Sequence, residues 1–270
     1  GAPVPLLMPD ASDFRTFPAG AEPGTVLHAI LEHAPFDGAE EQLRPLVQEH
    51  LSRLPLKDGE FEARAQATRS MMQRLLRAPI ATFGFALHEV PTHHTLREWQ
   101  FLLPLASANH AMTRQALADV FARHGGAHGE RYAEQILRLG VTRVHGYLTG
   151  FVDLLFEHHG RWYVVDWKSN QLGFEPGAYD TLALQEVMDG HHYTLQYHLY
   201  LVAAHRYLRQ RVPGYTYDTH IGGAAYAFLR GFAGDAADTS GWYVDRPAAA
   251  LIHALSDVLD GVSPAAGGRA

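Results

Sequence analysis

The sequence contains no cysteine, so disulfide bonds and thiolate-bound metal sites are excluded. No apolar run reaches the length of about 20 residues that a membrane-spanning helix needs. The chain also has no basic stretch followed by an apolar one, the pattern of a secretory signal. We therefore expect a cytoplasmic protein.

Basic residues are scarce relative to acidic ones. The chain has 22 Lys and Arg against 29 Asp and Glu, which gives a formal net charge of -7. A protein that coats nucleic acid with a broad surface is more often basic. The balance therefore argues against such a surface, but it is compatible with a narrow basic track beside a cluster of metal-binding carboxylates.

Several familiar motifs are also missing. The sequence has no G-x-x-x-x-G-K-[ST] and no G-x-G-x-x-G, so this chain has no ATP site of its own. The stretch HEVPTHH (88–94) lacks the H-E-x-x-H spacing of zinc proteases, and Pro91 would disrupt the helix that such a site requires. We find no internal repeat and no low-complexity linker.

The chain has 270 residues with 47% hydrophobic content, a composition typical of globular proteins. This is enough to form the core of one large domain or of two small ones. After an irregular start (1–22), apolar periodicity predicts an α/β core that follows a mostly helical N-terminal section. The expected helices are 22–33, 39–54, 59–80, about 111–123, about 130–138, about 179–188, 191–210 and 246–261. The expected strands are 96–105, the two β runs within 144–169, and 222–232.

The two β runs within 144–169 each contain one acid, Asp153 and Asp166, and EHHG (157–160) joins them. Glycine in a short polar connection is typical of a β-hairpin, which would bring the two carboxylates close together. A buried carboxylate is costly unless something compensates its charge, and a bound cation does so. Mg²⁺ prefers such hard oxygen ligands.

Lys168 follows Asp166 by two residues, so both side chains share one face of the strand. Its ammonium group is then placed to orient an attacking water or to stabilise charge on a phosphate. A bare D-x-K also occurs as a surface ion pair on an edge strand. Asp153 in the preceding apolar strand favours the functional interpretation.

The segment GFVDLLFEHHGRWYVVDWKSN (150–170) resembles the signature of the PD-(D/E)XK nuclease superfamily, with Asp153, Asp166 and Lys168 in the acid, acid and lysine places. Further stretches resemble the RecB-type nuclease family, in order along the chain. They are FPAGAEPGTVLHAILE (17–32), LQYHLYLVAAHRYLRQR (195–211), GGAAYAFLRG (222–231) and WYVDRPAAALI (242–252).

The resemblance implies a restriction-endonuclease-like core, in which helices flank a central mixed sheet. It implies one RecB-type nuclease domain over 1–270, with a helical section to about 140, a catalytic core to about 235 and a closing helix. It also implies that His28 and the Trp167 carbonyl bind Mg²⁺ together with Asp153 and Asp166. Imidazole is softer than the ligands Mg²⁺ usually takes, so Mn²⁺ should substitute.

Gln196 and Tyr200 are four residues apart and share a helix face, and the resemblance implies that they line the active site. Arg206, Arg209 and Arg211 follow at the end of the same predicted helix. They either contact DNA phosphates or complement the helix dipole. For Glu98, in a strand resembling one of the family, we expect a structural role.

The function that the resemblance implies is Mg²⁺-dependent exo- and endonucleolytic cleavage of DNA, chiefly single-stranded, during repair and recombination of double-strand breaks. An upstream RecB helicase region and the subunits RecC and RecD are the implied partners, together with control by Chi sites.

Two alternatives have different signatures. A non-catalytic relative that binds DNA as a scaffold would lose an acid or the lysine, and here all three are present. Stand-alone CRISPR adaptation nucleases and AddA-type nucleases of the superfamily commonly carry cysteine-held iron–sulfur clusters, which the composition excludes.

Overall fold

The computed structural model describes residues 10–80, 82–105, 112–140, 143–144, 146–175, 177–233 and 241–262. The α-helices of this part are α1 (Ala21–His33), α2 (Glu40–Leu51), α3 (Phe61–Arg77), α4 (Arg114–His124), α5 (Gly129–Leu137), α6 (Thr181–Gly190), α7 (Tyr193–Arg209), α8 (Tyr217–His220) and α9 (Ala249–Leu259). The strands are β1 (Thr95–Pro104), β2 (Met112–Thr113), β3 (Arg143–Val144), β4 (Tyr147–His158), β5 (Arg161–Lys168), β6 (Ile221–Phe228) and β7 (Trp242–Asp245).

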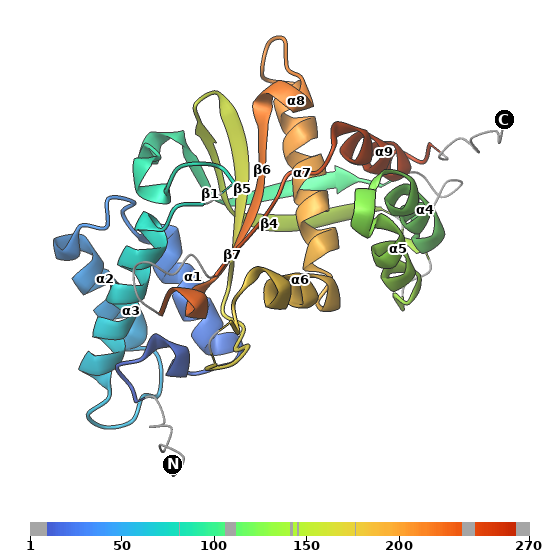
Figure 1. The fold of residues 1–270 in the computed structure, drawn as a ribbon. Helices are drawn as coiled ribbons and strands as arrows, with labels where there is room; N and C mark the ends of the chain where they lie inside the picture. Colours follow the sequence, from blue (N-terminus) through green and yellow to red (C-terminus); the bar gives the residue numbers. More distant parts are fainter. Residues whose placement is uncertain are drawn as a thin grey trace. The chain divides into compact units, whose positions relative to one another are not determined.

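Five of these strands form one mixed sheet in the order β1-β4-β5-β6-β7, with helices flanking it (Figure 1). This confirms the predicted α/β architecture. Strands β2 and β3 form a separate antiparallel pair, in which Met112 lies opposite Val144.

The chain folds into two compact units that interleave along the sequence. The first unit comprises 1–97, 165–184 and 225–244, and the second comprises 98–164, 185–224 and 245–270. Strands β1, β5, β6 and β7 each continue from one unit into the other.

The first unit contains the N-terminal helices, whose apolar stripes form its core. Helix α1 buries Val26, Leu27, Ile30 and Leu31, the stripe that the sequence predicts. Helix α2 packs against both α1 and α3, and α2 and α3 lie side by side (Figure 1). Arg74 of α3 donates from Nε to the carbonyl of Phe232 over 2.6 Å, which fixes the short 3₁₀ helix after β6 to α3.

The turn of the predicted hairpin lies in the second unit. Strands β4 and β5 are neighbours joined by two residues, His159 and Gly160, so they must run antiparallel. Both connecting residues have positive φ, 51° and 76°, as in the type I′ turns that match the twist of paired strands. The Gly160 amide donates to Glu157 Oε1 over 2.6 Å, which closes the turn.

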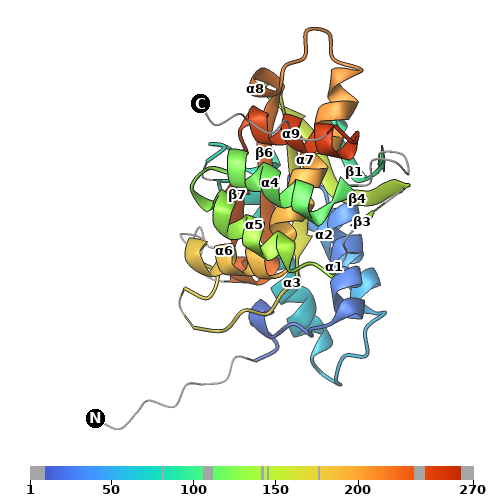
Figure 2. The same cartoon turned by 90° about the vertical axis from the view of Figure 1, so that its right-hand side faces the viewer.

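Helices α4 and α5 lie side by side in the second unit (Figure 2), and α7 packs against α9. His198 of α7 is buried, its Nδ1 is 2.7 Å from the carbonyl oxygen of Thr194, and its ring lies 4.9 Å from that of Phe121. Burial lowers the pKa of His198 to about 4, so this histidine is a neutral core residue.

Several predicted boundaries need correction, and some elements were not predicted. The helices expected at 39–54 and 59–80 end at Leu51 and Arg77. The expected strand 222–232 ends at Phe228, and Leu229–Ala233 form a 3₁₀ helix instead. The expected helix 111–123 begins at Arg114, and residue 111 lies outside the described residues. Strand β7 was not predicted, nor were the short elements β2, β3 and α8.

Candidate functional site

The end of β5 carries the predicted acid and lysine. Asp166 is only 3% exposed and follows the buried Val164 and Val165. The Lys168 Nζ atom lies 2.5 Å from Asp166 Oδ1, which confirms that the two side chains share one face of the strand. The same ammonium group lies 5.1 Å from the centre of the Tyr226 ring, a cation–π distance.

This ion pair is largely withdrawn from water, since the Lys168 side chain is 12% exposed. Removing one partner of such a pair leaves a buried charge and is strongly destabilising, whereas the intact pair adds little stability over an apolar core. A pair of this kind is therefore more readily explained by function than by folding.

Buried Arg230, which is 2% exposed, connects the segment before α1 to the residue after β5. Its guanidinium donates to the carbonyl of Ser169 from Nε over 3.0 Å. It also donates to the carbonyls of Arg15, Phe17 and Pro18 over 2.8, 2.7 and 3.1 Å. One side chain thus fixes the start of the helix that carries His28 beside the end of the strand that carries Asp166.

The first turn of α1 lies against the same strand end. A Cβ atom placed on Gly24 would be 3.2 Å from Ser169 Oγ, so glycine lets the helix approach this closely. His28 lies one turn further along α1 and is half-buried.

In the second unit, Asp153 occupies the middle of β4. It is 8% exposed, and its neighbours Val152, Leu154 and Leu155 are almost fully buried. An acid in such a strand needs a compensating charge, as the sequence predicts.

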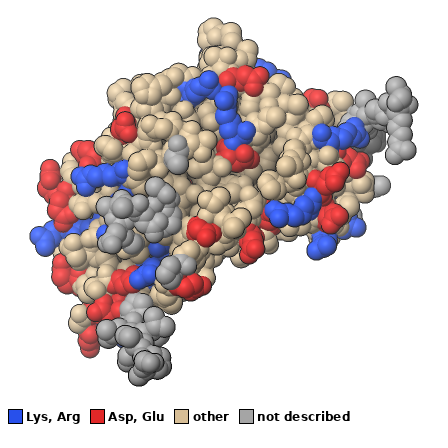
Figure 3. Space-filling view, viewed as in Figure 1, with Lys and Arg blue, Asp and Glu red and all other residues tan. Residues whose placement is uncertain are grey.

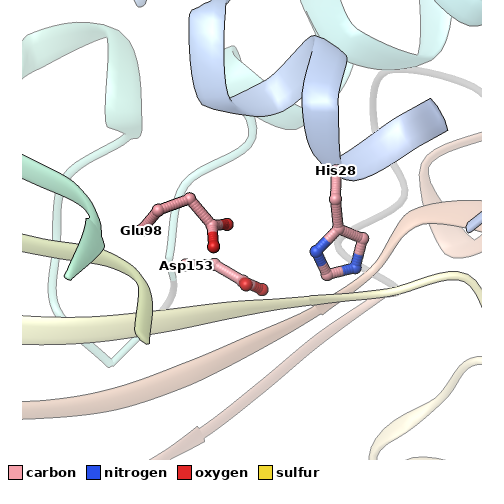
Figure 4. A group of neighbouring side chains, drawn as sticks. All are labelled: His28, Glu98 and Asp153. Atoms are coloured by element: carbon pink, nitrogen blue, oxygen red, sulfur yellow. The ribbon is translucent and has the colours of Figure 1, made fainter. Parts of the chain in front are cut away.

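The structure groups three side chains of metal-binding type. One potential ligand atom of each of His28, Glu98 and Asp153 lies within 4.8 Å of those of the other two (Figure 4). One imidazole and two carboxylates are a donor set that fits Mg²⁺ or Mn²⁺. Asp166 is not one of the three, so its role as a ligand stays a prediction, as does that of the Trp167 carbonyl.

Sequence reasoning gave Glu98 a structural role and missed it as a potential ligand. Glu98 has a φ of 49°, which is uncommon for a residue other than glycine. This backbone conformation interrupts the regular alternation of β1, so the strand pattern does not reveal where the side chain points. The sequence signal that could have indicated a ligand was an acidic residue within a predicted strand.

Gln196 and Tyr200 do share one face of α7, since Gln196 Nε2 donates to the Tyr200 hydroxyl over 2.8 Å. Both line a cavity of about 300 Å³ in the second unit, together with Phe101 and Gly150 of β1 and β4. A Cβ on Gly150 would lie 2.7 Å from the Phe101 ring, so the ring occupies the space that a side chain at position 150 would take.

The three arginines at the end of α7 have different surroundings. Arg206 donates to Ser256 Oγ and to its carbonyl over 2.9 and 2.7 Å, and it pairs with Asp260 at 2.9 Å. Its contacts therefore fix α9 to α7. Arg209 is exposed, and exposed Arg211 lies over the Tyr207 ring at 4.0 Å.

The surface carries charged side chains of both signs, as the counts of 22 Lys and Arg and 29 Asp and Glu lead one to expect. On the face that Figure 3 draws, Lys and Arg side chains are interspersed with Asp and Glu. Among the described residues, no helix combines the length and the apolar character that crossing a membrane demands.

A family model described as the PD-(D/E)XK nuclease superfamily matches residues 9–263. The chain belongs to this superfamily. The match includes His28, Glu98, both strand acids and Lys168. The ion pair confirms that Asp166 and Lys168 share one face of β5, and their place in the superfamily signature stays a prediction.

Three similar curated proteins are each named RecBCD enzyme subunit RecB. The protein of Escherichia coli (strain K12) is 34% identical over 248 residues, 92% of this chain. That of Haemophilus influenzae is 31% identical over 254 residues, 94% of this chain. That of Mycobacterium tuberculosis (strain H37Rv) is 31% identical over 268 residues, 92% of this chain. The chain spans only 20% to 24% of the length of these relatives.

Proposed function

We propose that this chain is the nuclease domain of a RecB-type protein, which hydrolyses phosphodiester bonds of single-stranded DNA during repair and recombination of double-strand breaks. The observation that carries the proposal is the buried Asp166–Lys168 ion pair at the end of β5, in a chain whose superfamily match extends over 9–263. We further propose that residues 1–270 act as one domain.

The residues that would hold Mg²⁺ are His28 and Asp153, with Asp166 and the Trp167 carbonyl completing the set. Glu98 is an alternative ligand, because it lies within 4.8 Å of His28 and Asp153. When bound, a divalent cation lowers the pKa of water and polarises phosphoryl oxygens.

Lys168 has a separate role in this proposal. Its ammonium group, paired with Asp166, donates N–H groups that orient the attacking water and neutralise charge on the phosphate. The water oxygen forms a bond to phosphorus, the bond to the 3′-oxygen breaks, and the products carry a 5′-phosphate and a 3′-hydroxyl.

Arg209 and Arg211, which are both exposed, are proposed contacts to DNA phosphates. Since Arg206 is engaged by Ser256 and Asp260, we assign it a supporting role instead. The relatives are named as subunits of a RecBCD enzyme, so we propose a helicase region in the same protein and RecC and RecD as partners.

Cleavage of an end-labelled single strand tests the proposal. We expect cleavage in Mg²⁺ or Mn²⁺, none in EDTA, and none after Asp166→Asn. Asp58→Asn is the matched control, because Asp58 is exposed. A chain that binds the strand without cutting it in either metal would instead be a scaffold module.

Metal affinity separates the two ligand sets. Calorimetric titration with Mn²⁺ should show weaker binding for Asp153→Asn and His28→Ala. Weaker binding after Glu98→Gln but not after Asp166→Asn would assign the cation to the group of Figure 4. The reverse result would assign it to the set that the family resemblance implies.

A further inference from the structure

A second pocket lies in the second unit, at the C-terminal end of α7. It shares no residue with the proposed catalytic and metal-binding residues, and among its lining residues Arg209 is the proposed DNA contact. Its volume is about 390 Å³, within the range of small-molecule sites. Four rings line it: His205 of α7, Tyr215 and Tyr217 at the start of α8, and His253 of α9.

The four rings surround the space at short range. The His205 ring lies 4.9 Å from His253 and 5.5 Å from Tyr215, measured between centroids. The Tyr217 ring lies 6.3 Å from His205 and 6.2 Å from His253. At these distances the four rings pack against one another. His205 and Tyr217 are buried, so exposed His253 and half-buried Tyr215 offer the ring surface on which another aromatic ring can stack.

Hydrogen bonds hold two sides of the pocket in place. His205 Nδ1 and the Tyr215 hydroxyl are 3.1 Å apart. Burial lowers the pKa of His205 to about 4 and raises the pKa of Tyr215, so the phenol donates to a neutral imidazole. Arg206 fixes α9 through Ser256, which also lines the pocket.

Tyr217 is 2% exposed, and its buried hydroxyl has no hydrogen-bond partner within the described part of the chain. Burying a hydroxyl without a partner is unfavourable, and native proteins seldom retain such a group without a reason. The ring of Tyr217 is therefore held at the pocket despite a cost to stability.

Charged groups of both signs surround the rings. Arg209 lines the pocket, as do Asp218 and Asp257, and all three are exposed. This mixture favours neither a simple anion nor a simple cation. It suits a flat ring that carries hydrogen-bond donors and acceptors, with a phosphate near Arg209.

We propose that this pocket binds one nucleobase, either of a free nucleotide or of a nucleotide within a single strand. The base stacks on the exposed ring of His253 beside Tyr215, the carboxylates accept from its amino and imino groups, and Arg209 contacts the sugar–phosphate. Aromatic stacking with a nearby basic group is the general means by which proteins hold single strands. This inference goes beyond the proposed nuclease activity and does not require it.

Calorimetric binding to the full chain in EDTA tests the pocket without any cleavage. The ligands are dGMP, a single-stranded oligonucleotide and the same oligonucleotide with abasic positions. The variants are His253→Ala and Arg209→Ala, both at exposed positions. The matched controls are His124→Ala and Arg138→Ala, which are exposed elsewhere in the same unit.

Because stacking contributes about 1–3 kcal/mol per base, His253→Ala should weaken binding by roughly fivefold or more. Weaker binding of dGMP alone would identify the ligand as a free nucleotide. Weaker binding of the base-carrying strand, but not of the abasic one, would identify it as DNA. The proposal is overturned if both variants bind every ligand as the controls do, or if His253→Ala weakens abasic and normal strands equally. Cleavage assays give a separate result, so either proposal can fail alone.

Discussion

Replacing Arg230 with alanine should strongly destabilise the first unit. The guanidinium makes four hydrogen bonds of 2.7–3.1 Å to main-chain carbonyls, and the side chain is 2% exposed. A hydrogen bond to a charged group contributes about 1.5–3 kcal/mol, but four bonds from one group are not additive. Truncating a buried charged partner typically costs about 3–5 kcal/mol, and we expect a loss in this range.

Urea unfolding followed by far-UV circular dichroism measures this loss as a lower midpoint. Arg230→Lys should recover only part of it, because a compact ammonium group cannot reproduce the planar fork that reaches four carbonyls. Arg211→Ala is the control, since Arg211 is exposed and should change stability by less than about 0.5 kcal/mol. A loss below about 1 kcal/mol for Arg230→Ala, or full recovery with lysine, would refute the assigned role.

Three further changes test other parts of the structure. Gly222→Ala should cost about 1–3 kcal/mol in urea unfolding, because a Cβ there would collide with the Tyr163 ring; unchanged stability would contradict this packing. Burial lowers the pKa of His198 from about 6.5 to about 4. The unfolded chain therefore binds the proton more readily than the folded chain. The contribution of neutral His198 to the free energy of unfolding is fully present above about pH 6.5 and is lost as the pH falls toward 4. His198→Phe should flatten that loss, by roughly 3 kcal/mol at most, and an unchanged pH profile would count against it. Lys168→Met should slow cleavage more than it weakens Mn²⁺ binding, whereas the opposite result in paired kinetic and calorimetric assays would make Lys168 a determinant of metal affinity.

Local patterns predicted much of the fold. The stripe of α1 and the β4–β5 hairpin depend on residues close in sequence, so periodicity and one glycine at the turn were sufficient. Strand β7 has only four residues, which is too short for an alternating pattern to stand out.

The parts of the site that sequence could not predict depend on distant partners. Arg206 was a candidate for DNA contact, but Ser256, 50 residues away, engages its guanidinium. The backbone at Glu98 departs from regular strand geometry, so alternation does not indicate its neighbours. By contrast, Asp166 and Lys168 are two residues apart on one strand, and their pairing followed from strand geometry.

The position of Arg230 late in the chain has a consequence for biosynthesis. Its carbonyl partners before α1 precede it by 212 to 215 residues. During translation at about 5–20 residues per second, those carbonyls leave the ribosome at least about 10 s before the guanidinium that binds them. The N-terminal helices of the nascent chain therefore lack the hydrogen bonds of Arg230 until that residue has been synthesised. Chaperones that protect exposed apolar surface have their greatest opportunity to act in that interval.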